Sequence, residues 1–524
     1  MKIISFCTLL LLSFSLSAQS PNPSVYAQTI ESNTLKEHVY KLASKELEGR
    51  ETGTPGNQKA AEYIASQFLL DGISPIPGDG DYFQEVAFSK IQWKVNQLKV
   101  NKTAEEDLKD YISIPQYFPD SAGRLQIKSL TFMGYGIDDP AYSDYKGKDL
   151  KGQHILVFSG EPRKRNGNYR ITNTDSASTW TSNVMRKIAA AKSAGVASIW
   201  IIQDDFKDLS TLARRTLLSE RMLMGSAKSL SASYIPHAFL TPSMGDQIMG
   251  KRKRKIIKLR NRIAQTGKPG QLEIPVDIDW NFAHQVKTTQ GQNVLGYIEG
   301  TDPQLKDELV VVSAHYDHLG RRGQEIYYGA DDNASGTSAV LEIAQAMELA
   351  KAKGDGPRRS VLCMLMTGEE KGLLGSQYYA EHPVFPLANT VADVNIDMIG
   401  RMDTLHKLPD YTYVIGSDRL STELHQINES MNQQYTHLKL DYTYNADNDP
   451  NRFYYRSDHY NFAKNGIPAI FFFSGVHADY HRPTDTPDKI MFDKARTIAQ
   501  LAFYTTWELA NRDQRIRVNV VGRN

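Results

Sequence analysis

Residues 309–318 read LVVVSAHYDH, an apolar run that ends in polar residues, and they indicate the class of fold. Its first six residues are small or apolar without a break, which is typical of a strand that is covered on both faces of a sheet. Similar apolar runs recur later in the chain, at residues 361–366, 391–396, 411–415 and 469–473. Helical patterns separate several of these runs. The alternation predicts a three-layer α/β domain with a mostly parallel sheet.

Polar side chains that can bind metals follow these predicted strands. In a mostly parallel sheet, ligands bind outside the carboxyl ends of the strands. The candidate residues, each at a strand exit or in an adjoining loop, lie in the stretches 315–318, 329–336 and 369–370, at Asp397, and in the stretch 480–486. A single aspartate of this kind is most often a helix cap. So many candidates at one predicted edge indicate a binding site instead.

The residue types favour a metal site over a nucleophilic one. Imidazole and carboxylate groups suit zinc and related divalent ions, and a catalytic zinc keeps one position open for water. Two ions about 3.5 to 4 Å apart need a bridging ligand, which a carboxylate supplies with its two oxygens. Cys363 lies in the middle of an apolar run and is predicted to be an inert core residue.

The motifs resemble those of the co-catalytic di-zinc aminopeptidase family, whose relatives include glutamate carboxypeptidase II and the transferrin receptor ectodomain. The resemblance covers most of residues 290–500. It rests on the motifs at residues 313–318, 329–336, 367–370, 395–400 and 479–481. Residues 47–55 also resemble the amino-terminal segment of that family.

The resemblance implies a site residue by residue. One zinc would be held by His315 and Asp397, the other by Glu370 and His481, and Asp332 would bridge both. Glu369 would be the general base.

Four further residues are candidates for supporting roles. Asp317 and Asp485 are predicted to accept the second ring N–H of His315 and His481, which would orient each imidazole. Tyr460 and His459 are candidates for contacting the substrate or its oxyanion.

The expected function is that of an exopeptidase that acts on peptide substrates. An aminopeptidase is the main hypothesis. The alternatives on the same scaffold are a carboxypeptidase or dipeptidase of the glutamate carboxypeptidase type and a glutaminyl cyclase with a single zinc. A non-catalytic binding ectodomain is a further alternative, although it predicts loss of ligands that this chain retains.

The chain is long enough for more than one domain. With 524 residues, two or three domains are expected. Residues 19–117 and 273–524 are predicted to form the zinc-peptidase domain, and residues 118–272 a smaller, β-rich α/β insertion. Residues 134–137, 151–152 and 155–158 resemble the protease-associated domain that some members of the family carry.

The amino terminus predicts export. Met1 and Lys2 precede an apolar run at residues 3–16 and then Ser17 and Ala18, a pattern typical of a signal peptide at residues 1–18 that is cleaved near Ala18. We therefore expect a secreted or periplasmic protein. No later segment reaches the ~18 continuous apolar residues of a membrane span, so the mature chain is predicted to have no integral membrane segment.

The overall charge argues against nucleic acid as a partner. Lys and Arg number 61 and Asp and Glu 60, so the formal net charge is +1. A chain so close to neutral lacks a bulk attraction to polyanions. The basic run at residues 251–255 is predicted to lie on the solvated face of a helix.

A homodimer is compatible with this sequence.

Overall fold

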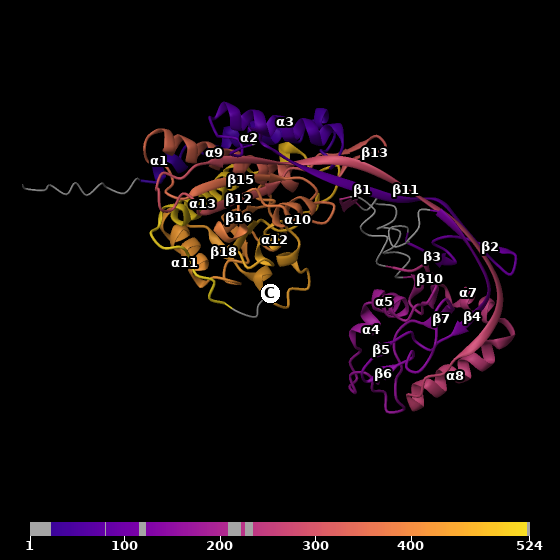
Figure 1. The fold of residues 1–524 in the computed structure, drawn as a ribbon. Helices are drawn as coiled ribbons and strands as arrows, with labels where there is room; N and C mark the ends of the chain where they lie inside the picture. The colour runs from indigo at the N-terminus through magenta and orange to yellow at the C-terminus, as the bar shows by residue number, and fades with distance from the viewer. Residues whose placement is uncertain (1–21, 79, 115–121, 208–221, 226–233, 521–524) are drawn as a thin grey trace, which may run out of the picture. The chain divides into compact units, whose positions relative to one another are not determined.

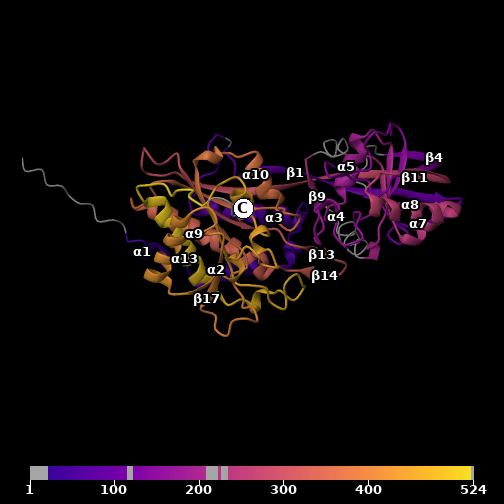
Figure 2. The ribbon, with the colours of Figure 1, turned by 90° about the horizontal axis from the view of Figure 1, so that it is seen from below.

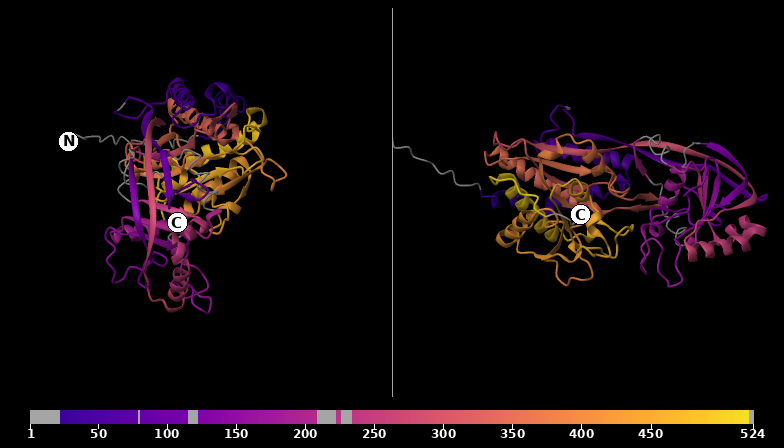
Figure 3. Two further views of the ribbon diagram at one scale, coloured as in Figure 1. Left: turned by 90° about the vertical axis from the view of Figure 1, so that its right-hand side faces the viewer. Right: turned by 60° about the horizontal axis from the view of Figure 1, so that its bottom comes forward.

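The computed structural model describes residues 22–78, 80–114, 122–207, 222–225 and 234–520. The chain divides into two compact units: unit 1 comprises the residues up to Glu85 and from Gln292 onward, and unit 2 is Val86–Gly291 (Figure 1). Two long strands, β1 (Phe83–Val100) and β11 (Leu272–Ile298), pair with each other and carry the chain between the units (Figure 3). The predicted signal peptide, residues 1–18, lies outside the described residues.

Unit 1 is built around a mixed sheet with a parallel centre. Its strands are β12 (Leu309–His315), β15 (Ser360–Met366), β16 (Thr390–Ile396), β17 (Tyr411–Ile415), β18 (Lys439–Asp441), β19 (Ala469–Phe473) and the end of β11. The order is β18-β17-β19-β16-β12-β15-β11, and the four strands from β19 to β15 are parallel to one another. Antiparallel pairs flank this centre, where β17 meets β19 and β11 meets β15. The predicted mostly parallel sheet is confirmed.

Helices cover both faces of this sheet, and they complete three layers. They are α1 (Ser24–Ala27), α2 (Ser32–Leu42), α3 (Pro55–Leu70), α9 (Gly336–Ala352), α10 (Leu374–Glu381), α11 (Thr422–Met431), α12 (His459–Ala463) and α13 (Phe492–Asn511). Alternate strand residues face opposite cores: Val310 and Val312 belong to the core that also contains residues of α2, α3, α9 and α13, whereas Val311 belongs to the core that contains Tyr379 of α10 and Phe462 of α12. Figure 2 shows α2, α9 and α13 side by side. A hairpin of β13 (Gly320–Arg322) and β14 (Glu325–Tyr327) follows β12.

Unit 2 has its own sheet and its own helices. Its strands besides β1 and β11 are β2 (Thr103–Glu105), β3 (Tyr111–Ile112), β4 (Ala122–Phe132), β5 (Asp138–Asp139), β6 (Tyr142–Ser143), β7 (His154–Phe158), β8 (Ser198–Ile202), β9 (Met222–Met224) and β10 (His237–Leu240). Its helices are α4 (Thr179–Ser182), α5 (Met185–Ser193), α7 (Pro242–Met249) and α8 (Lys253–Thr266). The sheet runs β11-β4-β7-β8-β10-β3, with β4, β7, β8 and β10 parallel. In α8, Ile256 and Ile263 are buried while residues 253–255 are exposed, as the basic run predicted.

The second unit is larger than the predicted insertion. The sequence boundaries were 118 and 272, but the compact unit extends from Val86 to Gly291. The difference arises because β1 and β11 are continuous strands, so the boundary between units falls inside each of them rather than in a loop. The likeness of this unit to a protease-associated domain stays a prediction.

Two further features concern the chain as a whole. Among the residues that the structure describes, none of the helices has the length and apolarity needed to cross a membrane. Cys363 is buried in β15, and burial raises the pKa of its thiol to about 12, in agreement with its predicted place in the core.

Candidate metal centre

Parallel strands bring the predicted site residues to one edge of the unit 1 sheet. His315 is the last residue of β12, and it pairs with Met366 at the end of β15. Glu369 and Glu370 follow β15, and Asp397 follows β16 directly. Since these strands are neighbours and parallel, their carboxyl ends place the side chains together, as the sequence pattern predicts.

Asp332 reaches the same edge from the irregular turn η6 (Ala330–Ser335). The backbone of Asp332 and Asn333 is not helical within this turn. The Asn333 side chain fixes it against the end of β16, because its Nδ2 donates to the carbonyl oxygen of Ile396 over 2.9 Å and its Oδ1 accepts from the Met398 N–H over 3.1 Å. The turn thereby holds the Asp332 carboxylate over the strand ends.

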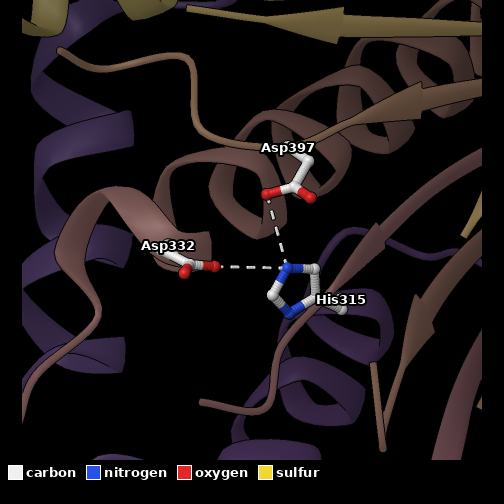
Figure 4. Close-up of side chains that lie close together, drawn as sticks. All are labelled: His315, Asp332 and Asp397. Atoms are coloured by element: carbon white, nitrogen blue, oxygen red, sulfur yellow. Dashed lines mark ion pairs between the residues drawn. The ribbon is translucent and has the colours of Figure 1, made fainter. Parts of the chain in front are cut away.

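A first cluster forms around the His315 imidazole. Its Nε2 lies 3.4 Å from Asp332 Oδ1 and 3.3 Å from Asp397 Oδ1 (Figure 4). Glu369 Oε2 lies 3.8 Å from the same nitrogen. One atom each from His315, Asp332 and Asp397 can lie within 4.8 Å of one another, close enough to hold a metal ion together.

A second cluster forms around the Glu370 carboxylate. Its Oε2 lies 3.3 Å from His481 Nε2, and its Oε1 lies 2.8 Å from His318 Nδ1. Asp332 joins this cluster through Oδ2, which is 3.1 Å from His481 Nε2 and 3.8 Å from His318 Nδ1. His318 was not among the predicted ligands, although it stands in the same quoted motif as His315.

The two oxygens of Asp332 face different clusters. Oδ1 is turned toward His315 and Oδ2 toward His481. This is the arrangement that a bridging carboxylate requires.

Buried atoms without hydrogen-bond partners indicate that a cation fits here. Within the described residues, His315 Nε2, Asp397 Oδ1, Glu370 Oε1 and both ring nitrogens of His318 are buried and lack a hydrogen bond. Buried polar atoms are normally paired, and each one left alone costs about 1 to 3 kcal/mol. These atoms are nitrogen and carboxylate oxygen ligands of the kind that zinc takes.

The adjacent residues Glu369 and Glu370 have pKa values that are shifted in opposite directions. Burial raises the pKa of the Glu369 carboxyl well above its usual range. Burial acts on Glu370 as well, but the adjacent imidazoles of His318 and His481 hold its pKa well below the usual range. Neighbouring carboxyl groups whose pKa values are shifted in opposite directions are typical of a pair in which one group transfers protons and the other binds as a charged ligand.

The aspartates predicted to orient the histidines have other partners. His315 Nδ1 makes its hydrogen bond to the backbone carbonyl oxygen of Asp317, 3.1 Å away, while the Asp317 carboxylate is 3.8 Å from it. That carboxylate accepts from Thr52 Oγ1 over 2.7 Å and from the Glu369 N–H over 3.1 Å. Asp317 therefore supports His315 through its backbone and positions Glu369 through its side chain.

Asp485 supports the Asp332 turn. Its carboxylate accepts from the backbone N–H of Asp331 over 3.0 Å and of Asp332 over 3.2 Å. The sequence predicts instead that Asp485 accepts the second ring N–H of His481. The chain turns between them, however, and the Asp485 carboxylate points to the backbone of the Asp332 turn.

A pocket opens beside the clusters. It is lined by Asp332, Glu369, Asp397, Met398, Phe453, Arg456, Phe471, Phe473, Val476, Tyr480 and His481. Its carboxylates lie next to an apolar wall formed by phenylalanine, methionine and valine side chains. Tyr480, which had no predicted role, stacks on His481 with 3.8 Å between ring centroids.

The predicted oxyanion candidates do not line this pocket. His459 is fully buried, and its ring stacks on Phe471 at 4.9 Å. The Tyr460 ring packs against Tyr455 at 5.0 Å. Both residues begin helix α12, which packs on β16 and β19, so His459 turns toward the core.

A family model for peptidase family M28 matches residues 293–506. A probable leucine aminopeptidase of Arthroderma otae is 30% identical over 246 residues, which are 42% of this chain and 64% of the relative. A probable glutamate carboxypeptidase of Arabidopsis thaliana is 34% identical over 132 residues, which are 25% of this chain and 17% of the relative. The match thus spans less than two thirds of each of these relatives.

A solved structure resembles most of the chain. An aminopeptidase from Aneurinibacillus sp. strain AM-1 aligns with a TM-score of 0.53 and 18% sequence identity, over 96% of this chain and 99% of the other. At this identity the likeness concerns the fold alone.

Proposed function

We propose that the chain, whose residues 293–506 belong to peptidase family M28, is a zinc-dependent aminopeptidase that uses two zinc ions bridged by Asp332. The observation that carries this proposal is the Asp332 carboxylate, which presents one oxygen to each of two clusters of histidine and carboxylate side chains. The relative of Arthroderma otae, which is named a probable leucine aminopeptidase, supports the same activity.

Five residues would hold the metal. His315 and Asp397 would bind one ion, Glu370 and His481 the other, and Asp332 both. His481 is a better ligand than His318 because it lines the pocket, and its Nε2 lies within 3.3 Å of both Asp332 and Glu370. His318 is fully buried, and its contact with Glu370 Oε1 would orient that carboxylate.

Glu369 would carry the proton during hydrolysis. Zinc, when bound, lowers the pKa of water toward ~7 and polarises a substrate carbonyl. Glu369 lines the pocket, and its carboxyl is free to accept a proton from the attacking water. The remaining hydroxyl adds to the carbonyl carbon, the C–N bond breaks, and Glu369 returns the proton to the leaving amine. Burial raises the pKa of the Glu369 carboxyl, which makes its carboxylate a stronger proton acceptor than an exposed one.

The pocket supports an amino-terminal substrate residue with an apolar side chain. Met398, Phe453, Phe471, Phe473 and Val476 form its apolar wall. The carboxylates beside this wall would attract the protonated α-amine of a peptide, and such an attraction favours cleavage at the amino terminus.

Arg456 favours a second candidate function, that of a carboxypeptidase or dipeptidase. It lines the same pocket, is exposed, and stacks its guanidinium on Phe453 with 4.7 Å to the ring centroid. A guanidinium in this place could bind the carboxylate at the end of a short peptide. The Arabidopsis relative that is named a probable glutamate carboxypeptidase supports this alternative.

Peptides with a blocked amino terminus distinguish an aminopeptidase from a carboxypeptidase. We expect the zinc-loaded protein to hydrolyse aminoacyl amides with apolar side chains and to leave peptides with a blocked amino terminus intact. Cleavage of the blocked peptides alone, from their free carboxyl end, would establish the carboxypeptidase instead. Metal analysis should give two zinc ions per chain, whereas one zinc with full activity would point to a site like that of a glutaminyl cyclase.

Export and assembly are proposals that need their own measurements. Export would be tested by sequencing the amino terminus of the protein recovered outside the cytoplasm, which should begin after Ala18. Light scattering of the purified protein would decide between a monomer and a homodimer.

A further inference from the structure

Arg50 is the most deeply buried cation near the metal centre. It follows the short helix η1 (Lys45–Leu47) and Gly49, whose missing side chain lets the chain pass close to the carbonyl oxygens of Gly320 and Tyr327. The Arg50 side chain is 0% exposed. Arginine is almost never fully buried unless it is paired. Within the described residues, no carboxylate lies at ion-pair distance from it.

The partners of Arg50 are backbone carbonyl oxygens. Its Nε donates to Tyr316 O over 2.7 Å, and its Nη2 donates to Gly329 O over 3.0 Å. Its Nη1 donates to Tyr328 O over 2.8 Å and to Leu42 O over 2.5 Å. One planar guanidinium therefore connects the end of α2 to two separate loops.

Both loops carry proposed zinc ligands. Tyr316 directly follows His315, and Gly329 precedes the turn that holds Asp332. The backbone of Arg50 adds a third link, because its carbonyl oxygen accepts from the His318 N–H over 3.3 Å. Although both loops are distant in sequence from Arg50, its guanidinium donates hydrogen bonds to each of them. Its removal would therefore break a link between the two loops.

The charge of Arg50 is retained despite its burial. Burial lowers the pKa of the guanidinium to about 10, and the carboxylates of Asp317, Asp332, Asp485 and Glu370 oppose that fall. Arg50 is thus a cation at neutral pH that faces a group of carboxylates. Its loss would remove the side-chain donor from the carbonyl oxygens of Leu42, Tyr316 and Tyr328, whereas Gly329 O would still accept from the Ala334 N–H.

We propose that Arg50 is a positioning residue for the metal centre, which holds the backbone of Tyr316 and Gly329 so that His315 and Asp332 stay at ligating distance before zinc binds. This inference rests on the proposed zinc site. Arg50 touches neither substrate nor metal in this scheme. It acts through the two loops, and its contribution is to zinc affinity more than to any chemical step.

Arg359 offers a matched control for the experiment. It is also 0% exposed and lies in unit 1. Its Nε donates to Glu308 Oε2 over 2.6 Å, and its Nη1 donates to Leu509 O over 3.2 Å, so it secures the end of α13 instead of the ligand loops. Arg359→Met removes a buried arginine of the same kind without touching the centre.

The experiment compares Arg50→Met, Arg50→Lys and Arg359→Met in the full chain. Zinc affinity is measured by competition with a chromogenic chelator, and the midpoint of thermal unfolding is measured with and without zinc. We expect both methionine variants to unfold at lower temperature when metal-free. Only Arg50→Met should bind zinc about 10- to 100-fold more weakly, the range found for residues that orient metal ligands. Arg50→Lys, which keeps the charge and some donors, should lie between Arg50→Met and the wild type.

Different results overturn different claims. Zinc affinity in Arg50→Met equal to that of Arg359→Met would overturn the positioning role. Tighter zinc binding would also overturn it, because it would mean that Arg50 acts mainly by repelling the cation. If Arg50→Met does not fold, Arg50→Lys decides, and unchanged affinity in that variant counts against the role. A wild type that binds no zinc would instead refute the proposed function itself.

Discussion

At the scale of single residues, the proton-transfer role of Glu369 is the most direct prediction. Glu369→Gln should keep both zinc ions, because Glu369 is not a proposed ligand, and should lose at least about 100-fold in kcat, since general base catalysis contributes 10²- to 10⁴-fold. Turnover of an aminoacyl amide and metal content are measured on the same sample. Glu381→Gln, an exposed change at the end of α10, serves as the control. A normal rate in Glu369→Gln would remove this residue from the mechanism.

The two histidines near Glu370 should differ in their effect on zinc content. His481→Ala should leave one zinc per chain, because it removes a proposed ligand. His318→Ala should retain two ions with weaker affinity, because it removes only a contact with Glu370 Oε1. Metal analysis after dialysis against a weak chelator distinguishes them. If His318→Ala loses one ion and His481→Ala keeps two, the assignments must be exchanged.

The candidate ligands could be predicted from sequence because they stand at strand exits within recognisable motifs. The supporting contacts could not. His315 forms a hydrogen bond with the backbone carbonyl oxygen of Asp317, and every residue type has such an oxygen, so the residue type cannot predict this contact. His459 was a candidate for contacting the substrate because it is a polar residue close to the motifs in sequence. The direction of α12, however, turns its side chain into the core. His318 could have been suspected from its position three residues after His315.

At the level of secondary structure, strands β12, β15, β16, β17 and β19 of unit 1 were predictable because each is a short apolar run, whereas β18, with the sequence KLD, was not. Helix α13 was not, although it is 20 residues long. It is buried around most of its circumference, from Lys494 to Ala510, and therefore lacks the one-sided apolar pattern that reveals a helix. The compact unit 2 is larger than the predicted insertion at residues 118–272, since β1 and β11 contribute to both units without a break in pattern, and the predicted domain limits stay a prediction.

Strand β10 provides a prediction for pH dependence. Burial lowers the pKa of His237 from 6.5 to about 4, so the folded protein keeps this imidazole neutral in weak acid. Between pH 6.5 and 4, the unfolded chain binds a proton that the folded chain does not, and the stability of unit 2 therefore falls as pH falls. By pH 5 the loss from this residue should be about 2 kcal/mol.

Urea unfolding at pH 7.5 and pH 5 measures this loss. Trp93, Trp180, Trp200 and Trp280 lie within unit 2, and they are four of the five tryptophans, so fluorescence reports mainly on that unit. His237→Asn cannot take up this proton on unfolding, so its stability should fall less between the two pH values. An equal fall in wild type and variant would show that other groups control the acid sensitivity.

At the scale of the whole molecule, the two units have separate hydrophobic cores. The cores around α9 and α12 belong to unit 1, and those around Trp200 and Ile199 belong to unit 2. The proposed zinc ligands all lie in unit 1, in the chain after Gln292. Unit 2 contributes none of them. The stability that zinc supplies should therefore be confined to one part of the chain.

Calorimetry of the full chain tests this division. A metal that binds only the folded state stabilises it by about 2.7 kcal/mol at a free concentration of 100 times Kd. We expect two thermal transitions, of which chelation lowers only one. Tryptophan fluorescence should follow the other transition and show the same midpoint with and without zinc, because it arises mainly from unit 2. If chelation lowers both midpoints together, then the units unfold as one cooperative body, and zinc at the edge of one sheet stabilises the whole molecule.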